Sequence, residues 1–294
     1  MKKVGIYGLG SMGFGMAQTL LRAGFSVFGH DVRADAVDRL CSEGGKTTSE
    51  ARLFDVVCIV VLNAHQTEMI LFGDEGIVAG LRPGAVIISC ATVDPEFARD
   101  MEARCASFGV HYLDAPISGG AVKAAQGALS IMASGTEQAF AAAEPVLTSL
   151  SENLFKLGNR AGAGSVMKSV NQLLAGVHIA AMAEALIFGL KQGLDPKTFL
   201  EVISQCAGTS WMLENRAPHI IAGDYTPKSA VNIWLKDLGI IMDIAQNQSC
   251  VTPLAQAALQ QFSAAADMGL GHEDDAAVTK FYAKLANIEL PKQG

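Results

Sequence analysis

One short segment constrains the fold of this chain more than any other, the turn Gly8-Leu9-Gly10-Ser11-Met12-Gly13. Residues 3–8 lead into it with strand character, and residues 13–23 after it carry apolar side chains at helical spacing. In this context the first glycine permits a tight turn, the second lets a pyrophosphate reach the backbone, and the third lets the helix pack on the strand. The free N–H groups at the helix start favour phosphate. The sequence therefore predicts a dinucleotide site.

An acidic residue, Asp31, ends the second predicted strand, eighteen residues after Gly13. A carboxylate at this position accepts hydrogen bonds from the adenosine ribose hydroxyls and repels a 2′-phosphate. We therefore predict NAD rather than NADP as the cofactor. Arg33, two residues further on, is a cation that softens this preference.

The first half of the chain alternates between strand-like and helix-like segments. Strands are predicted at 3–8, 26–31, 56–62, 85–90, 110–114 and 129–134, and helices at 13–23, 35–43, 95–108 and 137–149. Strands that are apolar on both faces and separated by helices indicate a mostly parallel sheet covered on both sides. After Gly158 only helices are predicted, at 165–191, 196–205, 229–246 and 253–268. We expect an α/β fold, a Rossmann-type doubly wound domain over 1–162 followed by an all-helical substrate and oligomerisation domain over 163–294.

Composition excludes several classes of partner. The net charge is −7 and no basic stripe is present, so neither nucleic acid nor an anionic membrane surface is an expected partner. The apolar run 56–62 is too short to span a bilayer, and the glycine turn follows the basic N-terminus at once, unlike a signal peptide. Six cysteines are scattered without a CxxC pair or metal-ligand spacing. We expect a cytoplasmic protein with reduced thiols and no metal site.

Lys168 stands near the start of the apolar segment 165–191. A cation among apolar side chains costs free energy unless it is paired, and burial or a neighbouring cation lowers a lysine's pKa until it can act as a general acid or base. Asn171 and Gln172 lie three and four residues on and share its helix face. In the alternative interpretation, the lysine stem packs on the helix and its ammonium reaches solvent. The motifs elsewhere in the chain favour catalysis.

Four motifs in order cover nearly the whole chain. They are the glycine turn at residues 8–13, Asp114-Ala115-Pro116-Ile117-Ser118-Gly119-Gly120, Gly162-x-Gly164-x-x-x-Lys168-x-x-Asn171, and Lys236-Asp237-Leu238. With these motifs the sequence resembles the β-hydroxyacid dehydrogenase family, which includes 3-hydroxyisobutyrate dehydrogenase and tartronate semialdehyde reductase. Segments 172–180, 210–216 and 223–236 resemble its L-threonate dehydrogenase branch most closely.

The resemblance implies hydride transfer from a secondary alcohol carbon to NAD, with Lys168 exchanging the hydroxyl proton. It also assigns roles to other positions. Asn171 orients the reacting oxygen or the amine, Ser118, Gly119 and Gly120 hold the substrate carboxylate, Lys236 lies near cofactor and substrate, and Leu62 and Thr92 belong to the cofactor site. The glycines suit close backbone approach, and their N–H groups suit an anion. A second cation, Lys236, lowers the expected pKa of Lys168.

Several alternatives stay open at this point. Gln172 and Ser229 depart from the residues that many relatives carry, which disfavours 3-hydroxyisobutyrate and suits a more hydroxylated acid. A tartronate semialdehyde or 3-hydroxyisobutyrate type enzyme is the alternative to L-threonate dehydrogenase. The helical domain is shorter than that of 6-phosphogluconate dehydrogenases. A dinucleotide-binding scaffold without activity is disfavoured by the presence of Lys168.

Three further positions have two interpretations each. His178 is a core or interface histidine or a substrate contact, and Trp211 packs between helices or lines the pocket. Asn232, one turn before Lys236, is a candidate for a substrate hydroxyl contact. The long apolar helix and the family together predict a homodimer or homotetramer.

Overall fold

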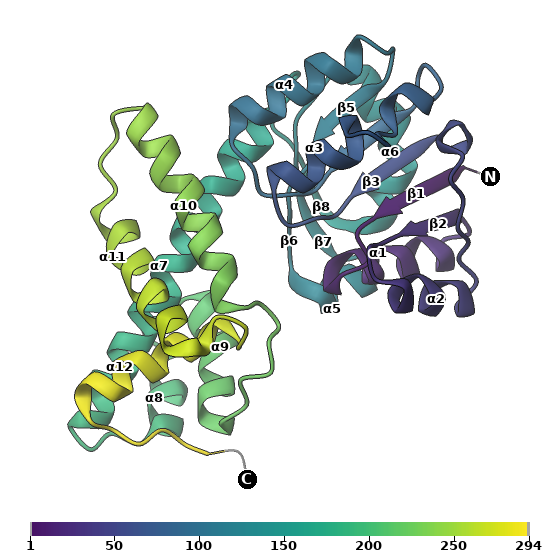
Figure 1. Cartoon of the computed structure of the whole chain (residues 1–294). Helices are drawn as coiled ribbons and strands as arrows, with labels where there is room; N and C mark the ends of the chain where they lie inside the picture. The colour runs from purple at the N-terminus through teal and green to yellow at the C-terminus, as the bar shows by residue number, and fades with distance from the viewer. Residues whose placement is uncertain (1, 293–294) are drawn as a thin grey trace. The chain divides into compact units, whose positions relative to one another are not determined.

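The computed structural model describes residues 2–292 (Figure 1). The chain forms two compact units, Met1–Lys168 and Ser169–Gly294. The first combines strands and helices, and the second is built from helices over its described residues. The predicted class, a Rossmann-type α/β domain followed by an all-α domain, is therefore confirmed.

Unit 1 contains a five-stranded parallel sheet with the order β2-β1-β3-β4-β5. Its strands are β1 (Lys3–Tyr7), β2 (Ser26–His30), β3 (Val56–Ile59), β4 (Val86–Ser89) and β5 (His111–Asp114). β3 and β4 are buried along their whole length, as expected of central strands covered on both faces.

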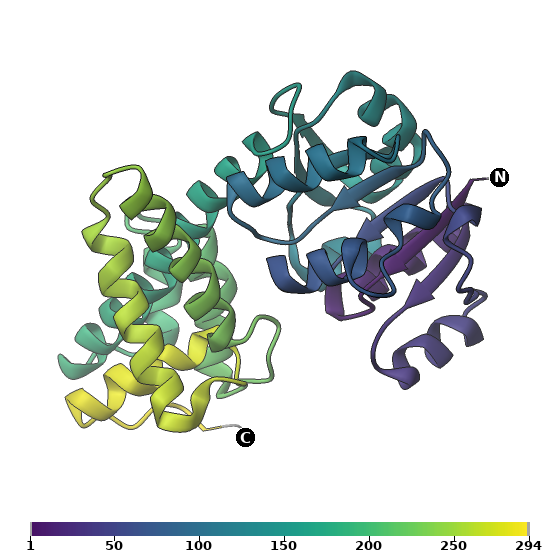
Figure 2. The same cartoon turned by 45° about the horizontal axis from the view of Figure 1, so that its top comes forward.

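Helices cover both faces of this sheet (Figure 2). They are α1 (Ser11–Arg22), α2 (Ala34–Ser42), α3 (Ala64–Phe72), α4 (Pro95–Ala106) and α6 (Glu137–Leu150). Alternate residues of β3 divide between the two layers, because successive side chains of a strand point to opposite faces. Val56 and Cys58 share a core with α1, α2 and α6, and Val57 and Ile59 share one with α3 and α4.

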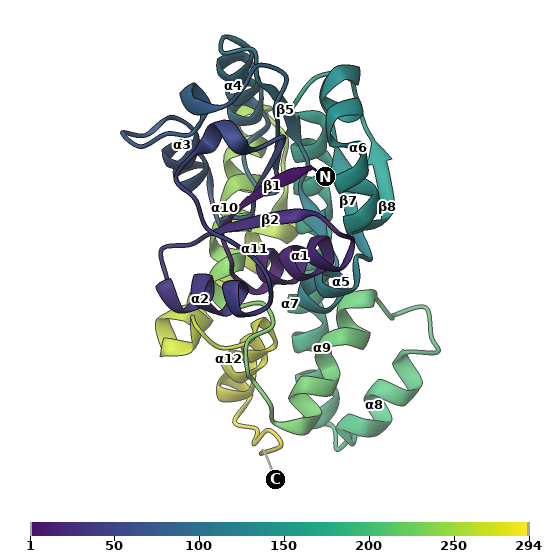
Figure 3. The ribbon, with the colours of Figure 1, turned by 90° about the vertical axis from the view of Figure 1, so that its right-hand side faces the viewer.

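A second sheet of three strands follows, with the order β6-β7-β8. Figure 3 shows β7 and β8 side by side. It consists of β6 (Ile117–Ser118), β7 (Leu129–Ala133) and β8 (Ser151–Lys156), with helix α5 (Gly120–Gln126) between the first two. The strand predicted at residues 129–134 forms as β7, but it belongs to this second sheet: it pairs with β6 and β8 and reaches β5 through the isolated bridge Asp114–Ser134. The mostly exposed strand β8 lacks the apolar run from which a strand is predicted.

Unit 2 is a helical array around a single apolar core. Its helices are α7 (Ala163–Lys191), which begins in unit 1, α8 (Pro196–Ile203), α9 (Trp211–Ala222), α10 (Val231–Asn247), α11 (Pro253–Ala265) and α12 (Val278–Ala286). Unit 2 also has a short 3-10 turn at Asp275–Ala277 and a π turn at Ala266–Leu270, and unit 1 has 3-10 turns at Ala51–Leu53 and Val78–Gly80. Gly176 lets α7 approach α10, because a Cβ there would lie 3.0 Å from the ring of Trp234. That ring stacks on Phe262 at 5.6 Å.

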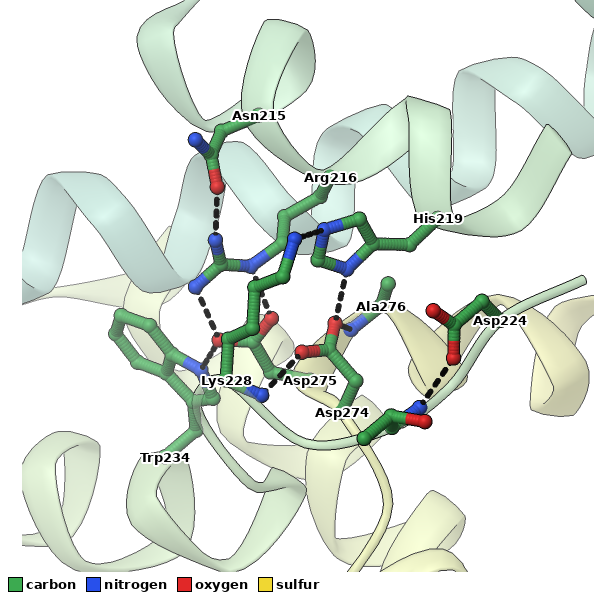
Figure 4. Close-up of polar contacts among 10 residues, drawn as sticks. Asn215, Arg216, His219, Asp224, Lys228, Trp234, Asp274, Asp275 and Ala276 are labelled. Atoms are coloured by element: carbon green, nitrogen blue, oxygen red, sulfur yellow. Dashed lines mark hydrogen bonds and ion pairs between the residues drawn. The ribbon is translucent and has the colours of Figure 1, made fainter. Parts of the chain in front are cut away.

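A buried polar network joins α9 and the loop before α10 to the segment before α12 (Figure 4). The guanidinium of Arg216 pairs with both carboxylate oxygens of Asp275, which also accepts a hydrogen bond from Trp234 Nε1 at 2.9 Å. Beside it, His219 Nδ1 lies 3.0 Å from Asp274 Oδ1, and the other ring nitrogen lies 2.7 Å from Lys228 Nζ. Arg216, His219, Asp274 and Asp275 are buried, and their burial is tolerated because each has polar partners.

Helix α7 has 29 residues and, by length and composition alone, could cross a membrane. Its apolar window has a hydropathy of 1.9, and 39% of that window is buried. Within unit 2 its exposed apolar side chains form one stripe, because their spacing of three, four or seven residues keeps them on one face. The stripe, called here the α7 stripe, consists of Val170, Leu174, Ala181, Ala185 and Phe188.

Candidate functional site

The glycine turn follows β1 and opens α1, as predicted. Gly8 has a φ of +97°, and a Cβ on it would lie 2.3 Å from the carbonyl oxygen of Val60. A Cβ on Gly13 would lie 1.9 Å from the carbonyl oxygen of Gly8. These two glycines are therefore required by the packing of the turn itself. Gly10 differs, since a Cβ there would meet nothing within 4 Å.

The start of α1 suits a diphosphate. Gly10 is the N-cap and offers no side-chain cap, and the first helical hydrogen bond runs from Phe14 N to Gly10 O. The N–H groups of the first helical turn therefore have no partner within the helix, and Ser11 lies exposed beside them. Together with the positive end of the helix dipole and the open space over Gly10, these groups fit the phosphates of a dinucleotide.

Asp31 is tied to this turn. Its Oδ2 accepts a hydrogen bond from Leu9 N at 2.7 Å, and its Oδ1 accepts one from Arg33 N at 2.9 Å. Burial acts to raise the pKa of Asp31, but the hydrogen bonds from Arg33 and Leu9 and the charge of Arg33 outweigh it and leave the pKa below its usual value. The guanidinium of Arg33 also folds back, with its Nε 3.3 Å from Asp31 Oδ1 and its Nη2 3.3 Å from Leu9 O.

The remaining cofactor candidates of unit 1 also follow the carboxyl ends of parallel strands. Leu62 comes after β3, is 56% exposed, and donates its N–H to Gln66 Oε1 at 2.9 Å. Thr92 comes after β4 and is half-buried. Parallel strands end at one edge of the sheet, where α/β folds bind ligands. The structure thus places the glycine turn, Asp31, Leu62 and Thr92 along that edge.

Ser118, Gly119 and Gly120 lie where β6 turns into α5. The two glycines have φ values of +135° and +74°, a backbone conformation that other residues rarely adopt. A Cβ on Gly120 would meet nothing within 4 Å, so the backbone of this turn is open to a ligand at Gly120, whereas a Cβ on Gly119 would lie 2.9 Å from Lys123 Cβ.

Lys168 lies beside this turn. Its side chain is buried, with 7% of the residue exposed. Its Nζ donates a hydrogen bond to the carbonyl oxygen of Ile117, at 2.8 Å. Ile117 directly precedes Ser118. Unit 1 by itself therefore brings the predicted proton-transfer lysine to the turn Ser118-Gly119-Gly120, called here the carboxylate loop because it is predicted to bind the substrate carboxylate. The alternative of a lysine that reaches solvent does not describe Lys168.

Two predicted residues, Asn171 and Lys236, belong to unit 2 and are joined by a chain of polar contacts. Asn171 Nδ2 donates to Gln172 Oε1 at 2.9 Å, and Gln172 Nε2 donates to Asp237 Oδ2. Lys236 Nζ pairs with the other oxygen of Asp237 at 2.6 Å. Asp237 is only 2% exposed. The sequence did not predict that Asp237 and Gln172 hold these two residues, although the adjacency of Asp237 to Lys236 was a signal for it.

The three undecided positions differ in exposure. Trp211 is 61% exposed at the start of α9, so it does not pack between helices within the described chain. His178 is half-buried on α7. Asn232 is exposed, and its amide lies so close to Gly271 that a Cβ there would be 2.5 Å from its oxygen. Among residues 2–292, no group of three His, Cys, Asp or Glu side chains is arranged to hold a metal.

Comparison with protein families assigns both halves of the chain. Residues 3–158 match the NAD-binding domain of 6-phosphogluconate dehydrogenase. Residues 162–282 match the domain described as the NAD-binding part of NADP-dependent 3-hydroxyisobutyrate dehydrogenase. The second match begins at Gly162, where the Lys168 motif begins.

Individual relatives match over nearly the full length. An L-threonate dehydrogenase from Cupriavidus necator is 49% identical, with 99% of this chain and 98% of that protein covered. An L-threonate dehydrogenase from Escherichia coli O6:H1 is 42% identical, with 98% and 96% covered. The crystal structure of a 3-hydroxyisobutyrate dehydrogenase from Salmonella typhimurium superposes with a TM-score of 0.90 at 42% identity, covering 96% of this chain and 100% of that one.

Proposed function

Because the chain belongs to the β-hydroxyacid dehydrogenase family of NAD-binding enzymes, we propose that it oxidises L-threonate to 2-dehydro-L-erythronate. The supporting relatives are L-threonate dehydrogenases of 40% to 49% identity. The observation that carries the proposal is the hydrogen bond of 2.8 Å from Lys168 Nζ to Ile117 O. It holds an amine beside a turn suited to a carboxylate, which is the pair of groups that a hydroxy acid requires.

Bound NAD would accept the hydride from the carbon that bears the hydroxyl group. The hydroxyl proton of the substrate passes to Lys168 Nζ as the C–O bond becomes a carbonyl. Ser118 and the N–H groups of Gly119 and Gly120 bind the carboxylate and fix the carbon that is oxidised. Asn171 and Lys236 contribute to substrate binding, and the contacts through Gln172 and Asp237 restrict their rotamers.

Replacing the proposed proton-transfer group is the direct test. We expect Lys168→Ala to lower kcat by about 10²- to 10⁴-fold, the usual contribution of a general acid or base, while NADH still binds. A matched control is Lys284→Ala, which removes an exposed lysine from α12. Near wild-type kcat in Lys168→Ala would refute the assignment.

The substrate proposal is tested with C3 to C5 hydroxy acids, including both enantiomers of threonate and erythronate. We expect the highest kcat/KM with L-threonate. A higher value for glycerate or 3-hydroxyisobutyrate would favour the alternative, a tartronate semialdehyde or 3-hydroxyisobutyrate type enzyme. Absence of hydroxy-acid-dependent NAD reduction across the panel would favour a dinucleotide-binding scaffold.

We also propose NAD rather than NADP. Asp31 stays ionised beside the glycine turn, and a carboxylate there repels a 2′-phosphate. Arg33 is held on Asp31 and Leu9, which limits its availability to a phosphate. We expect kcat/KM for NAD to exceed that for NADP, and Asp31→Asn to reduce the ratio. Equal kcat/KM for the two cofactors in the wild type would remove this role from Asp31.

The proposed assembly is a homodimer or homotetramer. The α7 stripe supports it, since Phe188 is 70% exposed and Leu174 50% exposed, and exposed apolar patches mark contact surfaces. We propose that the protein acts in the cytoplasm, without membrane or nucleic-acid partners. Light scattering after size-exclusion chromatography tests the assembly, and Phe188→Glu is expected to shift the mass toward the monomer. A monomeric wild type would contradict it.

A further inference from the structure

The buried carboxylate of Asp114 lies at the end of β5, within the second motif but outside the residues to which the resemblance gives a role. It is 1% exposed. Four donors surround it, and they come from two segments distant in sequence. Gly162 N and Ser165 N donate to Oδ2 at 2.9 and 2.8 Å, Ser165 Oγ donates to Oδ1 at 2.7 Å, and Ser134 Oγ donates to Oδ2 at 3.3 Å.

These contacts place a negative charge at the first turn of α7. Helix N-termini present unpaired N–H groups and the positive end of the helix dipole, so a carboxylate is stabilising there. Burial, the largest influence, raises the pKa of Asp114, and the hydrogen bonds from Ser165, Gly162 and Ser134 oppose it. Four donors and no acceptor are the partners of an ionised carboxylate.

The helix start fits this site closely. A Cβ on Gly164 would lie 2.4 Å from Met132 O and 2.7 Å from Asp114 O, so only glycine allows the first turn to lie this near β5 and β7. Gly164 N also donates to Ser134 Oγ at 2.9 Å. The first turn of α7 is thus hydrogen-bonded to Asp114 at the end of β5 and to Ser134 after β7, and these two side chains are also hydrogen-bonded to each other.

Residues 114–117 therefore constrain Lys168 through two sets of hydrogen bonds. Asp114 fixes the helix start three residues before Lys168, at Ser165, and Ile117, three residues after Asp114, accepts the hydrogen bond from Lys168 Nζ. Both sets lie within unit 1. The direction of the lysine side chain depends on the helix start, because a shift of the first turn moves the Cα of Lys168 relative to Ile117.

We propose that Asp114, with Ser165, is a positioning residue that sets the place of Lys168 against the carboxylate loop. The proposal rests on the proposed function for its effect on turnover, but the position of Lys168 is measurable without turnover. A role in stability alone would lower the amount of folded enzyme and leave kcat per folded site unchanged.

The test compares Asp114→Asn and Ser165→Ala with Asp195→Asn. Asp195 is the N-cap of α8, where its Oδ2 accepts from Thr198 N at 2.9 Å, so the control also removes a carboxylate from a helix start. For each variant, kcat is taken per NADH-binding site, and KM for L-threonate is measured. Labelling of Lys168 by trinitrobenzenesulfonate is followed by peptide mass spectrometry, with the exposed Lys284 as the internal reference.

We expect kcat of Asp114→Asn to fall by about 10- to 100-fold, the cost of a small misplacement of a catalytic group, and that of Ser165→Ala to fall less. KM is expected to change by less than about threefold, since the carboxylate loop is retained. Lys168 should label several times faster relative to Lys284 in Asp114→Asn, and Asp195→Asn should change neither quantity.

Unchanged kcat and unchanged labelling of Lys168 in Asp114→Asn would overturn the proposal. Equal losses of kcat in Asp114→Asn and Asp195→Asn would also overturn it, because a general stability effect would then explain them. If the wild type oxidises no hydroxy acid, the proposed function fails, and the labelling comparison still decides whether Asp114 positions Lys168.

Discussion

Alanine should have different effects at two glycines of the same turn. Gly10→Ala should weaken cofactor binding and leave stability nearly unchanged, whereas Gly13→Ala should lower stability. A Cβ on Gly10 meets nothing within 4 Å, and its φ of −67° and ψ of −169° suit alanine. Gly10→Ala reduces the entropy of the unfolded chain, a gain of ~0.4–1 kcal/mol, and replaces a favourable N-cap residue at a similar cost. We therefore expect the free energy of unfolding to change by less than about 1 kcal/mol.

We also expect Gly10→Ala to bind NADH more weakly than the wild type. The methyl group would occupy the space through which a pyrophosphate approaches the helix start. Overpacking of this kind costs ~1–3 kcal/mol, so the Kd for NADH should rise by about ten- to a hundredfold.

Gly13→Ala provides the comparison. Its Cβ would lie 1.9 Å from Gly8 O and 3.0 Å from Gly8 C, and these backbone atoms cannot rotate away. The helix start and the strand end must separate, so we expect a loss of at least ~1 kcal/mol in the free energy of unfolding despite alanine's better helix propensity.

Urea unfolding followed by circular dichroism measures the stability of both variants, and quenching of intrinsic fluorescence measures NADH binding. Wild-type affinity in Gly10→Ala would refute the placement of the phosphates over Gly10. Wild-type stability in Gly13→Ala would refute the geometry of the turn.

Two more predictions concern unit 2. Arg216→Leu leaves Asp275 buried without its cation, so we expect the free energy of unfolding, measured in urea, to fall by ~3–5 kcal/mol. Burial already raises the pKa of Asp275 against the influence of Arg216, so without Arg216 the folded form retains a proton that the unfolded chain loses above pH ~4. The loss should therefore be larger at pH 7 than at pH 5, and an equal loss at both values would contradict this reasoning. Asp237→Asn removes the charge that holds Lys236 and leaves a single oxygen where two now serve Lys236 and Gln172, so KM for the hydroxy acid should rise while the Kd for NADH changes less; an unaltered KM would argue against this holding role.

The residues predicted from the sequence are those whose chemistry is local. The spacing of Gly8, Gly10 and Gly13 implied a turn between a strand and a helix, and the structure forms that turn. Asp31 was predicted to interact with the cofactor ribose, a role that stays a prediction, but its hydrogen bond to Leu9 N needs the ends of β1 and β2 to be neighbours.

The parts that the sequence did not predict depend on pairings between distant residues. Residues 129–134 have the pattern of a strand for either sheet, and only the pairing with β6 and β8 decides which one they join. Likewise, β8 and α5 are too short or too exposed to be distinguished by periodicity.

The sequence by itself identified the family and the residues predicted to carry its chemistry, because a glycine turn, an acidic residue after the second strand and a lysine motif are each recognised from residues close together in the chain. The tertiary structure decided how that chemistry is held in place. Asp114 meets Ser165 across 51 residues, and Gln172 meets Asp237 across 65. Such partners are set by the packing of whole elements, which a pattern of adjacent residues does not encode.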